Sequence, residues 1–235
     1  MSEFVDMTIS DLRYHVLPAK RLAGSSFAQL HDNVFNFFVR RWTEAFSEIE
    51  DQGTPASGWE DHFLKQDIVT AITYKGEVVA AHLYTVYDLS AASTKKSEYF
   101  SFFSSEAMKA WEGMGVRNVT SMEYLCVDAK FKKNQLGLSL GKIILGLGAY
   151  MTEEKGLDAA IGTPLVGNKV DLMMENVGGH LLEKDINKYG FAVDLWSIPT
   201  KPCLKNKDPK YDVSMKHLWN HREDFTKEYF NKLVA

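Results

Sequence analysis

The sequence has little cysteine, no long apolar run and no excess of positive charge. Its two cysteines, Cys126 and Cys203, stand far apart in 235 residues and form no CxxC pair, so they give no basis for a disulfide framework or a cysteine zinc site. No window approaches the roughly 18 continuous apolar residues of a membrane-spanning helix. A net charge of -4, with scattered lysines and arginines, argues against a nucleic-acid partner. We expect a cytoplasmic protein without a membrane span.

The remaining composition, 45% apolar and 25% charged, is that of an ordinary folded protein, and the length suits one large domain. Prolines at 199, 202 and 209 interrupt the pattern before the last helical segment. We therefore predict a main domain over residues 1–200 and a helical extension over 201–235 that packs on the same domain. Its apolar stripe predicts one C-terminal helix containing Val213, Leu218, Phe225, Tyr229 and Leu233.

Periodicity and turn residues predict strands that alternate with helices in the middle of the chain and hairpins on either side. We expect strands over 12–16, 68–74, 77–87, 119–127, 157–162, 180–186 and 191–198, and helices over 26–49, 105–111, 136–156 and 169–176. Lys75-Gly76 and the segment 187–190 are the expected hairpin turns. This order predicts an α/β (α+β) fold with a mixed central sheet flanked by helices.

The segment VDAKFKKNQLGLSLGKIIL, residues 127–145, gathers cationic and flexible residues at a strand-to-helix corner. It contains Lys132, Lys133, Asn134, Gln135 and Gly137. The free N–H groups at a helix start attract anions, glycine allows close approach, and lysine adds charge. The corner is neither a P-loop nor a GxGxxG motif. It predicts a pyrophosphate cradle, with an ordinary helix start behind a solvated lysine pair as the alternative.

The corner resembles the loop of the Gcn5-related N-acetyltransferase (GNAT) superfamily, V-x-P-x-x-[RQ]-x-x-G-x-[GA] followed by a leucine-rich helix. Without a gap, Val127 falls on the valine, Lys132 on the Arg/Gln position, Gln135 on the first glycine, Gly137 on the second and Leu140 on the helix leucine. Lysine and glutamine are departures. Since backbone N–H groups make most of that loop's pyrophosphate contacts, the resemblance still implies coenzyme A binding.

A second family pattern, N-x-x-A-x-x-x-Y-x-x-x-G-F, lies on Asn168, Asp171, Glu175, Gly179 and His180. The asparagine matches at Asn168, and the glycine in the second-to-last position matches at Gly179. Glu175 stands where many family members have the tyrosine that protonates the departing thiolate. By the order of elements the resemblance covers about residues 66–198, and it implies a mostly antiparallel sheet.

The resemblance implies an acyltransferase that moves an acyl group, acetyl first, from acetyl-CoA or another acyl-CoA to a small-molecule amine. No metal is implied, and His217 and His221 lack a third ligand. The expected donor-binding residues are Cys126, Val127, Lys132, Lys133, Asn134, Gln135, Leu136, Gly137, Leu138 and Asn168.

Glu123 is the first candidate for the catalytic base. It shares strand parity with Leu125 and Val127, and partial burial at a strand end raises a carboxyl pKa toward a useful value. Glu175 is the second candidate. Solvent-facing glutamates are the alternative for both, and Cys126 is interpreted as a small buried hydrophobe rather than a nucleophile.

Two other functions stay open. The terminal helices hint at the branch of long-chain N-acyl amino acid synthases and acyl-homoserine-lactone synthases, whose acyl carrier protein would meet a basic patch at Lys130, Lys132 and Lys133. The aromatic cluster 99–103 would then line an acyl pocket, although core packing is the simpler role. A CoA-binding sensor without turnover is the other possibility, and a homodimer through the terminal helices remains open.

Overall fold

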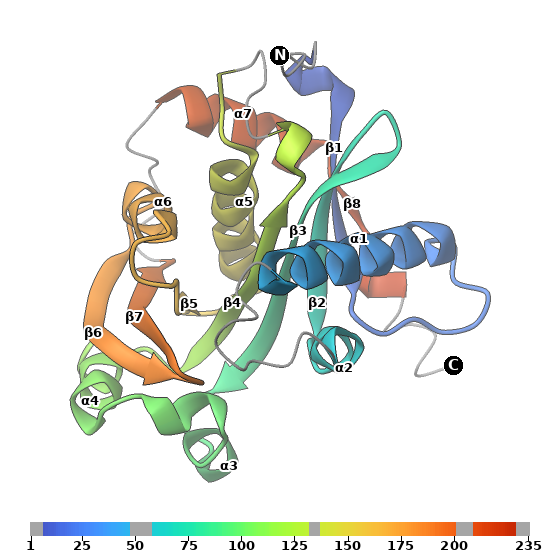
Figure 1. Cartoon of the computed structure of the whole chain (residues 1–235). Coiled ribbons are helices and arrows are strands. Elements are labelled where there is room, and N and C mark those ends of the chain that lie inside the picture. Colours follow the sequence, from blue (N-terminus) through green and yellow to red (C-terminus); the bar gives the residue numbers. More distant parts are fainter. Residues whose placement is uncertain (1–6, 48–57, 132–136, 201–208, 229–235) are drawn as a thin grey trace. The chain divides into compact units, whose positions relative to one another are not determined.

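The computed structural model describes residues 7–47, 58–131, 137–200 and 209–228. Within these residues eight strands form a sheet in the order β6-β7-β5-β4-β3-β2-β1-β8, flanked by helices (Figure 1). The strands are β1 (Leu12–Pro18), β2 (Ile68–Tyr74), β3 (Glu77–Asp88), β4 (Asn118–Val127), β5 (Ala159–Gly162), β6 (His180–Lys188), β7 (Phe191–Pro199) and β8 (Glu223–Asp224). The helices are α1 (Ala28–Ser47), α2 (Trp59–Leu64), α3 (Ala92–Lys95), α4 (Ser105–Gly113), α5 (Leu140–Glu154), α6 (Val170–Asn176) and α7 (Pro209–Asn220).

The sheet is mixed and mostly antiparallel, as predicted. β1 pairs with β2, β2 with β3, β5 with β7 and β6 with β7 in antiparallel fashion, whereas β4–β5 and β1–β8 are parallel.

The chain divides into two units. The first holds Met1–Thr85, Tyr124–Ile144 and Val213–Ala235, and the second holds Val86–Glu123 and Leu145–Asp212. The strands β3 and β4 and the helices α5 and α7 each pass from one unit to the other.

The core of the first unit lies between α1, α2 and the face of β2 and β3 (Figure 1). Apolar side chains recur along α1 at helical spacing, so Val34 and Phe38 point inward and are fully buried. Phe63 of α2 packs between Phe38, at a ring separation of 5.5 Å, and Phe35, at 5.3 Å edge to face. Burial of this aromatic stripe holds both helices on the sheet.

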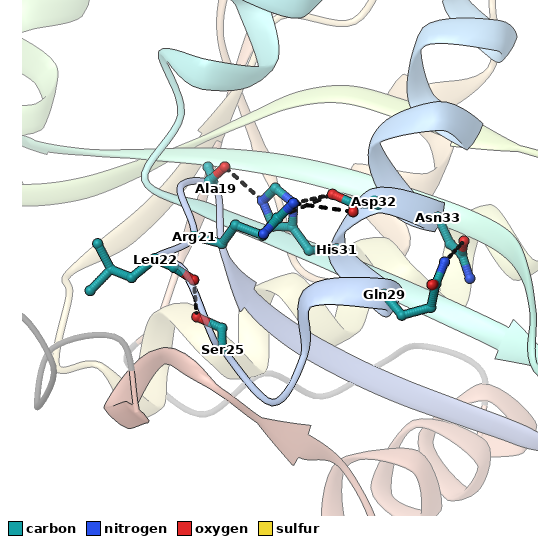
Figure 2. Close-up of polar contacts among 8 residues, drawn as sticks. All are labelled: Ala19, Arg21, Leu22, Ser25, Gln29, His31, Asp32 and Asn33. Atoms are coloured by element: carbon teal, nitrogen blue, oxygen red, sulfur yellow. Dashed lines mark hydrogen bonds and ion pairs between the residues drawn. The ribbon is translucent and has the colours of Figure 1, made fainter.

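Polar contacts fix the direction in which α1 leaves β1, as Figure 2 shows. The buried His31 donates from Nε2 to the carbonyl of Ala19 at 2.9 Å, which ties the first turn of α1 to the end of β1. Arg21 donates to both carboxylate oxygens of Asp32, at 3.1 and 3.2 Å. A buried histidine bonded to backbone and a two-point Arg–Asp pair together restrict this connection.

The core of the second unit is aromatic and centres on Trp111, which is fully buried. Its indole N–H donates to Ser197 Oγ at 3.2 Å, linking α4 to β7. The hairpin of β6 and β7 turns through Tyr189 and Gly190, with φ angles of 54° and 85°. Positive φ at both central residues is the type I′ pattern that two-residue hairpins favour. This turn holds Lys188 at the end of β6 in a fixed position.

The C-terminal segment corrects one expectation. It is not one helix over 213–233, because α7 ends at Asn220 and β8 then pairs with β1 in parallel, His15 beside Glu223. Asp224 Oδ1 accepts from Thr226 N at 2.9 Å, which caps a new turn and competes with helix continuation. Pairing with β1 also satisfies backbone groups of an edge strand. The domain limits at 200 and 201 remain a prediction.

The close approach of α6 to the start of β6 gives a stability prediction. A Cβ at Gly179 would lie 2.7 Å from the Met174 carbonyl oxygen and 3.0 Å from its carbonyl carbon. Gly179→Ala should therefore lower the free energy of unfolding by roughly 1–3 kcal/mol, because backbone atoms have to move. Urea denaturation measures this change.

The control is Gly113→Ala at the end of α4, where a Cβ meets nothing within 4 Å. Alanine there should leave the free energy of unfolding unchanged or raise it by roughly 0.5–1 kcal/mol. Equal stability of the two variants would contradict the packing described for Gly179.

Candidate functional site

The parallel pairing of β4 with β5 ends before β4 does. The register runs from Val119 opposite Ala159 to Met122 opposite Gly162, and β4 then continues to Val127. Tyr124, two residues beyond the last pair, has a φ of 57°, which is left-handed and unusual for an aromatic residue in a strand. From Glu123 onward, β4 therefore lies outside the β5 ladder, and the left-handed Tyr124 interrupts its extended backbone.

Glu123 lies at this point and is partly buried. Its Oε1 accepts a hydrogen bond from Ser121 Oγ at 2.6 Å. Desolvation raises the pKa of the Glu123 carboxyl, and the Ser121 hydrogen bond and the positive charge of Lys188 only partly oppose this. The predicted partial burial is observed, while the role of Glu123 as base stays a prediction.

Lys188 belongs to the same group of side chains and was missed by the sequence analysis. Its Nζ donates to Thr163 Oγ1 at 3.1 Å and lies over the Tyr99 ring, 4.2 Å from the centroid. Burial lowers the pKa of Lys188, although Glu123 and Glu98 act in the opposite direction. Thr163 directly follows β5, so the ammonium lies beside the end of that strand. A lysine before a hairpin turn looks like a solvated residue in sequence, which is why no signal indicated it.

In the first unit, side chains from α1 and α2 surround Tyr124. Trp42 Nε1 donates to the carbonyl of Tyr124 at 3.2 Å, and the Tyr124 hydroxyl bonds to His62 Nδ1 at 2.8 Å. The rings of Trp42 and Tyr124 meet edge to face at 5.3 Å. These contacts stabilise the left-handed conformation of Tyr124. His62 was not among the residues that the sequence selected, because no local motif marks it.

Cys126 is buried among the apolar residues of the first unit. Its thiol donates to the carbonyl of Ala81 at 3.7 Å, and burial raises the pKa of the thiol to about 12. A thiolate is therefore strongly disfavoured, in keeping with the interpretation of Cys126 as a small hydrophobe.

The predicted donor-binding residues are only partly described. Lys132, Lys133, Asn134, Gln135 and Leu136 lie outside the described residues. Gly137 is exposed with a φ of 58°, and Leu138 is buried just before α5. Val127 is partly buried at the end of β4.

The second motif lies at the start of α6. The exposed side chain of Asn168 accepts at Oδ1 from Val170 N, at 3.0 Å, and so binds the first residue of the helix. Glu175 is exposed on the same helix. The hydrogen bond of Asn168 goes to Val170 and that of Glu123 to Ser121. The roles expected for Asn168 and Glu175 remain predictions.

Several other candidates have structural roles. Tyr99, Phe100 and Phe103 belong to the core of the second unit, as the simpler interpretation expected. His217 and His221 stack at 4.5 Å, and within the described residues no group of three or more His, Cys, Asp or Glu side chains could hold a metal. Across the same residues, no helix is long and apolar enough to span a membrane. A cavity of about 480 Å³ beside Asp158, His180 and Ser197 contains none of the predicted site residues.

The burial of Cys126 gives a prediction that needs no substrate. In a Cys203→Ser variant, the remaining thiol should not react with iodoacetamide at pH 8 while the protein is folded, because it is both buried and protonated. Mass spectrometry measures the labelling. Urea should expose the thiol and permit rapid reaction. Rapid labelling of the folded variant would contradict the packing of Cys126.

Comparison with known proteins identifies the fold. No family model matches the sequence, and no curated protein sequence matches it. A CoA-dependent acyl-homoserine lactone synthase, BjaI, matches with a TM-score of 0.56 and 9% identity over 91% of this chain and 93% of its own. FeeM, an N-acyl amino acid synthase from uncultured soil microbes, matches with a TM-score of 0.51 and 11% identity over 88% and 97%.

A polyamine N-acetyltransferase of Drosophila melanogaster matches with a TM-score of 0.54 and 11% identity, over 80% of this chain and 99% of its own. At these identities the likeness is one of fold. Since synthases and N-acetyltransferases of different activity share this fold, activity has to be argued from the residues. The chain has the GNAT acyltransferase fold.

Proposed function

We propose that this protein is a cytoplasmic acyltransferase that moves an acyl group, acetyl first, from acyl-CoA to a small-molecule amine by direct attack. One observation carries the proposal. A partly buried carboxyl with a raised pKa, Glu123, lies where β4 continues beyond its pairing with β5, in a fold shared with acyltransferases. A carboxylate whose pKa is raised is a better proton acceptor than an ordinary glutamate.

In the proposed reaction, Glu123 accepts a proton from the acceptor ammonium. The nitrogen lone pair then attacks the thioester carbonyl carbon and forms the C–N bond. The C–S bond breaks with its electron pair on sulfur. The nitrogen loses its second proton as the amide forms, and the thiolate takes up one proton to leave as the thiol. No covalent intermediate on the protein is needed, which agrees with a Cys126 thiol that stays protonated.

For the donor, we propose that the backbone at Cys126 and Val127 bonds to the pantetheine arm and that the loop 132–138 binds the pyrophosphate. The positive φ of Gly137 suits a turn whose N–H groups converge on an anion. Lys132 and Lys133 would add positive charge, and Asn168 would contribute from the start of α6. The proposal includes no metal.

A second function is an acyl carrier protein-dependent synthase of long-chain N-acyl amino acids. The chain matches BjaI and FeeM over 91% and 88% of its length, against 80% for the N-acetyltransferase. Because the match to the synthases covers more of this chain, it favours a synthase as the second candidate function. The basic residues Lys130, Lys132 and Lys133 would then meet the acidic carrier protein. A sensor that binds CoA without turnover is the remaining alternative, and a homodimer is compatible with each of these functions.

Donor binding tests the proposal first. Calorimetry of the purified protein with acetyl-CoA, octanoyl-CoA, palmitoyl-CoA and desulfo-CoA should give binding to all four, because the nucleotide and pantetheine are shared. Similar affinities favour acetyl transfer, and a preference for palmitoyl-CoA favours the long-chain synthase. Binding without amine-dependent thiol release would indicate the sensor. No binding to any of the four would contradict CoA-dependent transfer.

The base is tested by Glu123→Gln. We expect kcat to fall by roughly 10²–10⁴-fold, a typical contribution of general-base catalysis. The pKa of Glu123 is raised, so wild-type kcat should begin to fall with acid at a higher pH than an ordinary glutamate would cause. The variant should lose this limb of the pH profile. Thiol release followed by absorbance measures both.

Glu175→Gln is the matched comparison, since Glu175 is exposed and was the second candidate. A loss confined to Glu123→Gln assigns the base to β4. A loss confined to Glu175→Gln would move it to α6, and the proposal for Glu123 would be withdrawn.

A further inference from the structure

Lys188 is a partly buried cation that forms no ion pair within the described residues. Its neutral contacts are Thr163 Oγ1 at 3.1 Å and the face of Tyr99 at 4.2 Å. An ammonium has three N–H donors, and a single hydroxyl accepts one of them. Removing such a group from water costs free energy unless a charged partner compensates. The carboxylates of Glu123 and Glu98 attract this charge but form no ion pair with it within the described residues. The ammonium therefore keeps N–H donors for a ligand anion.

The surrounding structure holds this ammonium in place. Lys188 is the last residue of β6 and pairs with Phe191 across the two-residue turn. Gly190 N donates to Asn187 Oδ1 at 3.0 Å, and the Tyr189 ring packs against Phe102 at 4.8 Å. A flexible side chain that is anchored at the base and at Nζ loses less entropy on binding a ligand.

Lys188 also lies near Glu123. Its Nζ donates to Thr163, which directly follows Gly162, and Gly162 pairs with Met122, the residue before Glu123. The two charges attract each other across this strand end. In the proposed function, Glu123 contacts the ammonium of the acceptor and accepts its proton. An α-amino acid carries its ammonium and its carboxylate on one carbon, so any site that contacts both needs an anionic and a cationic side chain as neighbours. The second unit provides this pair in Glu123 and Lys188. A simple amine has no carboxylate to pair with the Lys188 ammonium.

We propose that Lys188 binds the carboxylate of the acceptor, and that the acceptor is therefore an α-amino acid whose ammonium lies at Glu123. Thr163 and Tyr99 position the ammonium of Lys188, and Lys188 determines specificity without taking part in the proton transfer. The inference rests on the proposed function and adds the class of acceptor. For an acetyl donor the acceptor class is new, and for a long-chain donor Lys188 supplies the residue that binds the amino acid.

The experiment compares amino acids with the amines that differ from them only by loss of the carboxylate. L-phenylalanine, L-tyrosine and L-leucine are paired with phenethylamine, tyramine and isopentylamine, with acetyl-CoA and palmitoyl-CoA as donors, and thiol release gives kcat/KM. Wild-type protein should favour at least one amino acid over its amine by 10-fold or more. In Lys188→Met this ratio should fall by roughly 10–100-fold, as expected for a lost charged hydrogen bond.

Lys184→Met is the control, because Lys184 is exposed on the same strand. Its ratio should equal that of wild type, and Lys188→Arg should retain part of the preference because the positive charge remains. The ratio is an internal measure, so a general loss of folded protein does not change it. If Lys188→Met gives no transfer, calorimetry with L-phenylalanine and phenethylamine on the folded variant replaces it, and loss of amino-acid binding alone supports the proposal.

Two results would overturn the inference. One is a wild-type protein that acylates the amines as well as the amino acids, and the other is an unchanged ratio in Lys188→Met. If the ratio is unchanged because both acceptor classes lose activity equally, Lys188 is assigned to the proton transfer instead. No thiol release from wild type with any donor and acceptor would overturn the proposed function itself, a result separate from an active enzyme without preference for a carboxylate.

Discussion

The early end of the β4–β5 ladder is the constraint on which the candidate site depends. Only four residue pairs form, and continuation in register would place Thr163 and Pro164 beside Glu123 and Tyr124. Pro164 has no N–H to donate, so the ladder cannot extend through it. The chain after β5 turns to β7 instead, where Asp194 N donates to the Pro164 carbonyl at 3.1 Å and Leu165 bridges Val193. Because residues 164 and 165 bond to β7, β4 has no β5 partner from Glu123 onward.

The left-handed conformation of Tyr124 needs support, since an aromatic residue there costs on the order of 1–3 kcal/mol. In the first unit, Trp42 binds its carbonyl and His62 binds its hydroxyl. Phe38 adds an edge-to-face contact at 5.8 Å. The aromatic stripe of α1 therefore has two roles: it forms the core, and it holds a strained residue of β4 directly after Glu123.

Local sequence signals predicted most of the helices and strands, whereas contacts between residues far apart in the sequence were not predicted. The hairpin at Lys75-Gly76 and the turn over 187–190 were predicted because each contains a glycine, Gly76 or Gly190, and glycine adopts positive φ at no steric cost. The single C-terminal helix was wrong because pairing with β1 is a tertiary contact that outweighs helical periodicity. Alternation selected Glu123, yet Tyr124 interrupts that alternation. Lys188 lies 65 residues beyond Glu123, and no spacing rule joins them.

The arrangement of Glu123 and Lys188 explains why the pKa of the carboxyl is raised rather than lowered. A direct ion pair with Lys188 would favour the carboxylate and make it a weaker proton acceptor. Thr163 and Tyr99 instead engage the ammonium, so desolvation dominates the environment of Glu123. The two charges attract each other but form no ion pair, and the pKa of Glu123 therefore stays raised. This arrangement differs from an exposed salt bridge, which forms a direct ion pair and adds little to the free energy of unfolding.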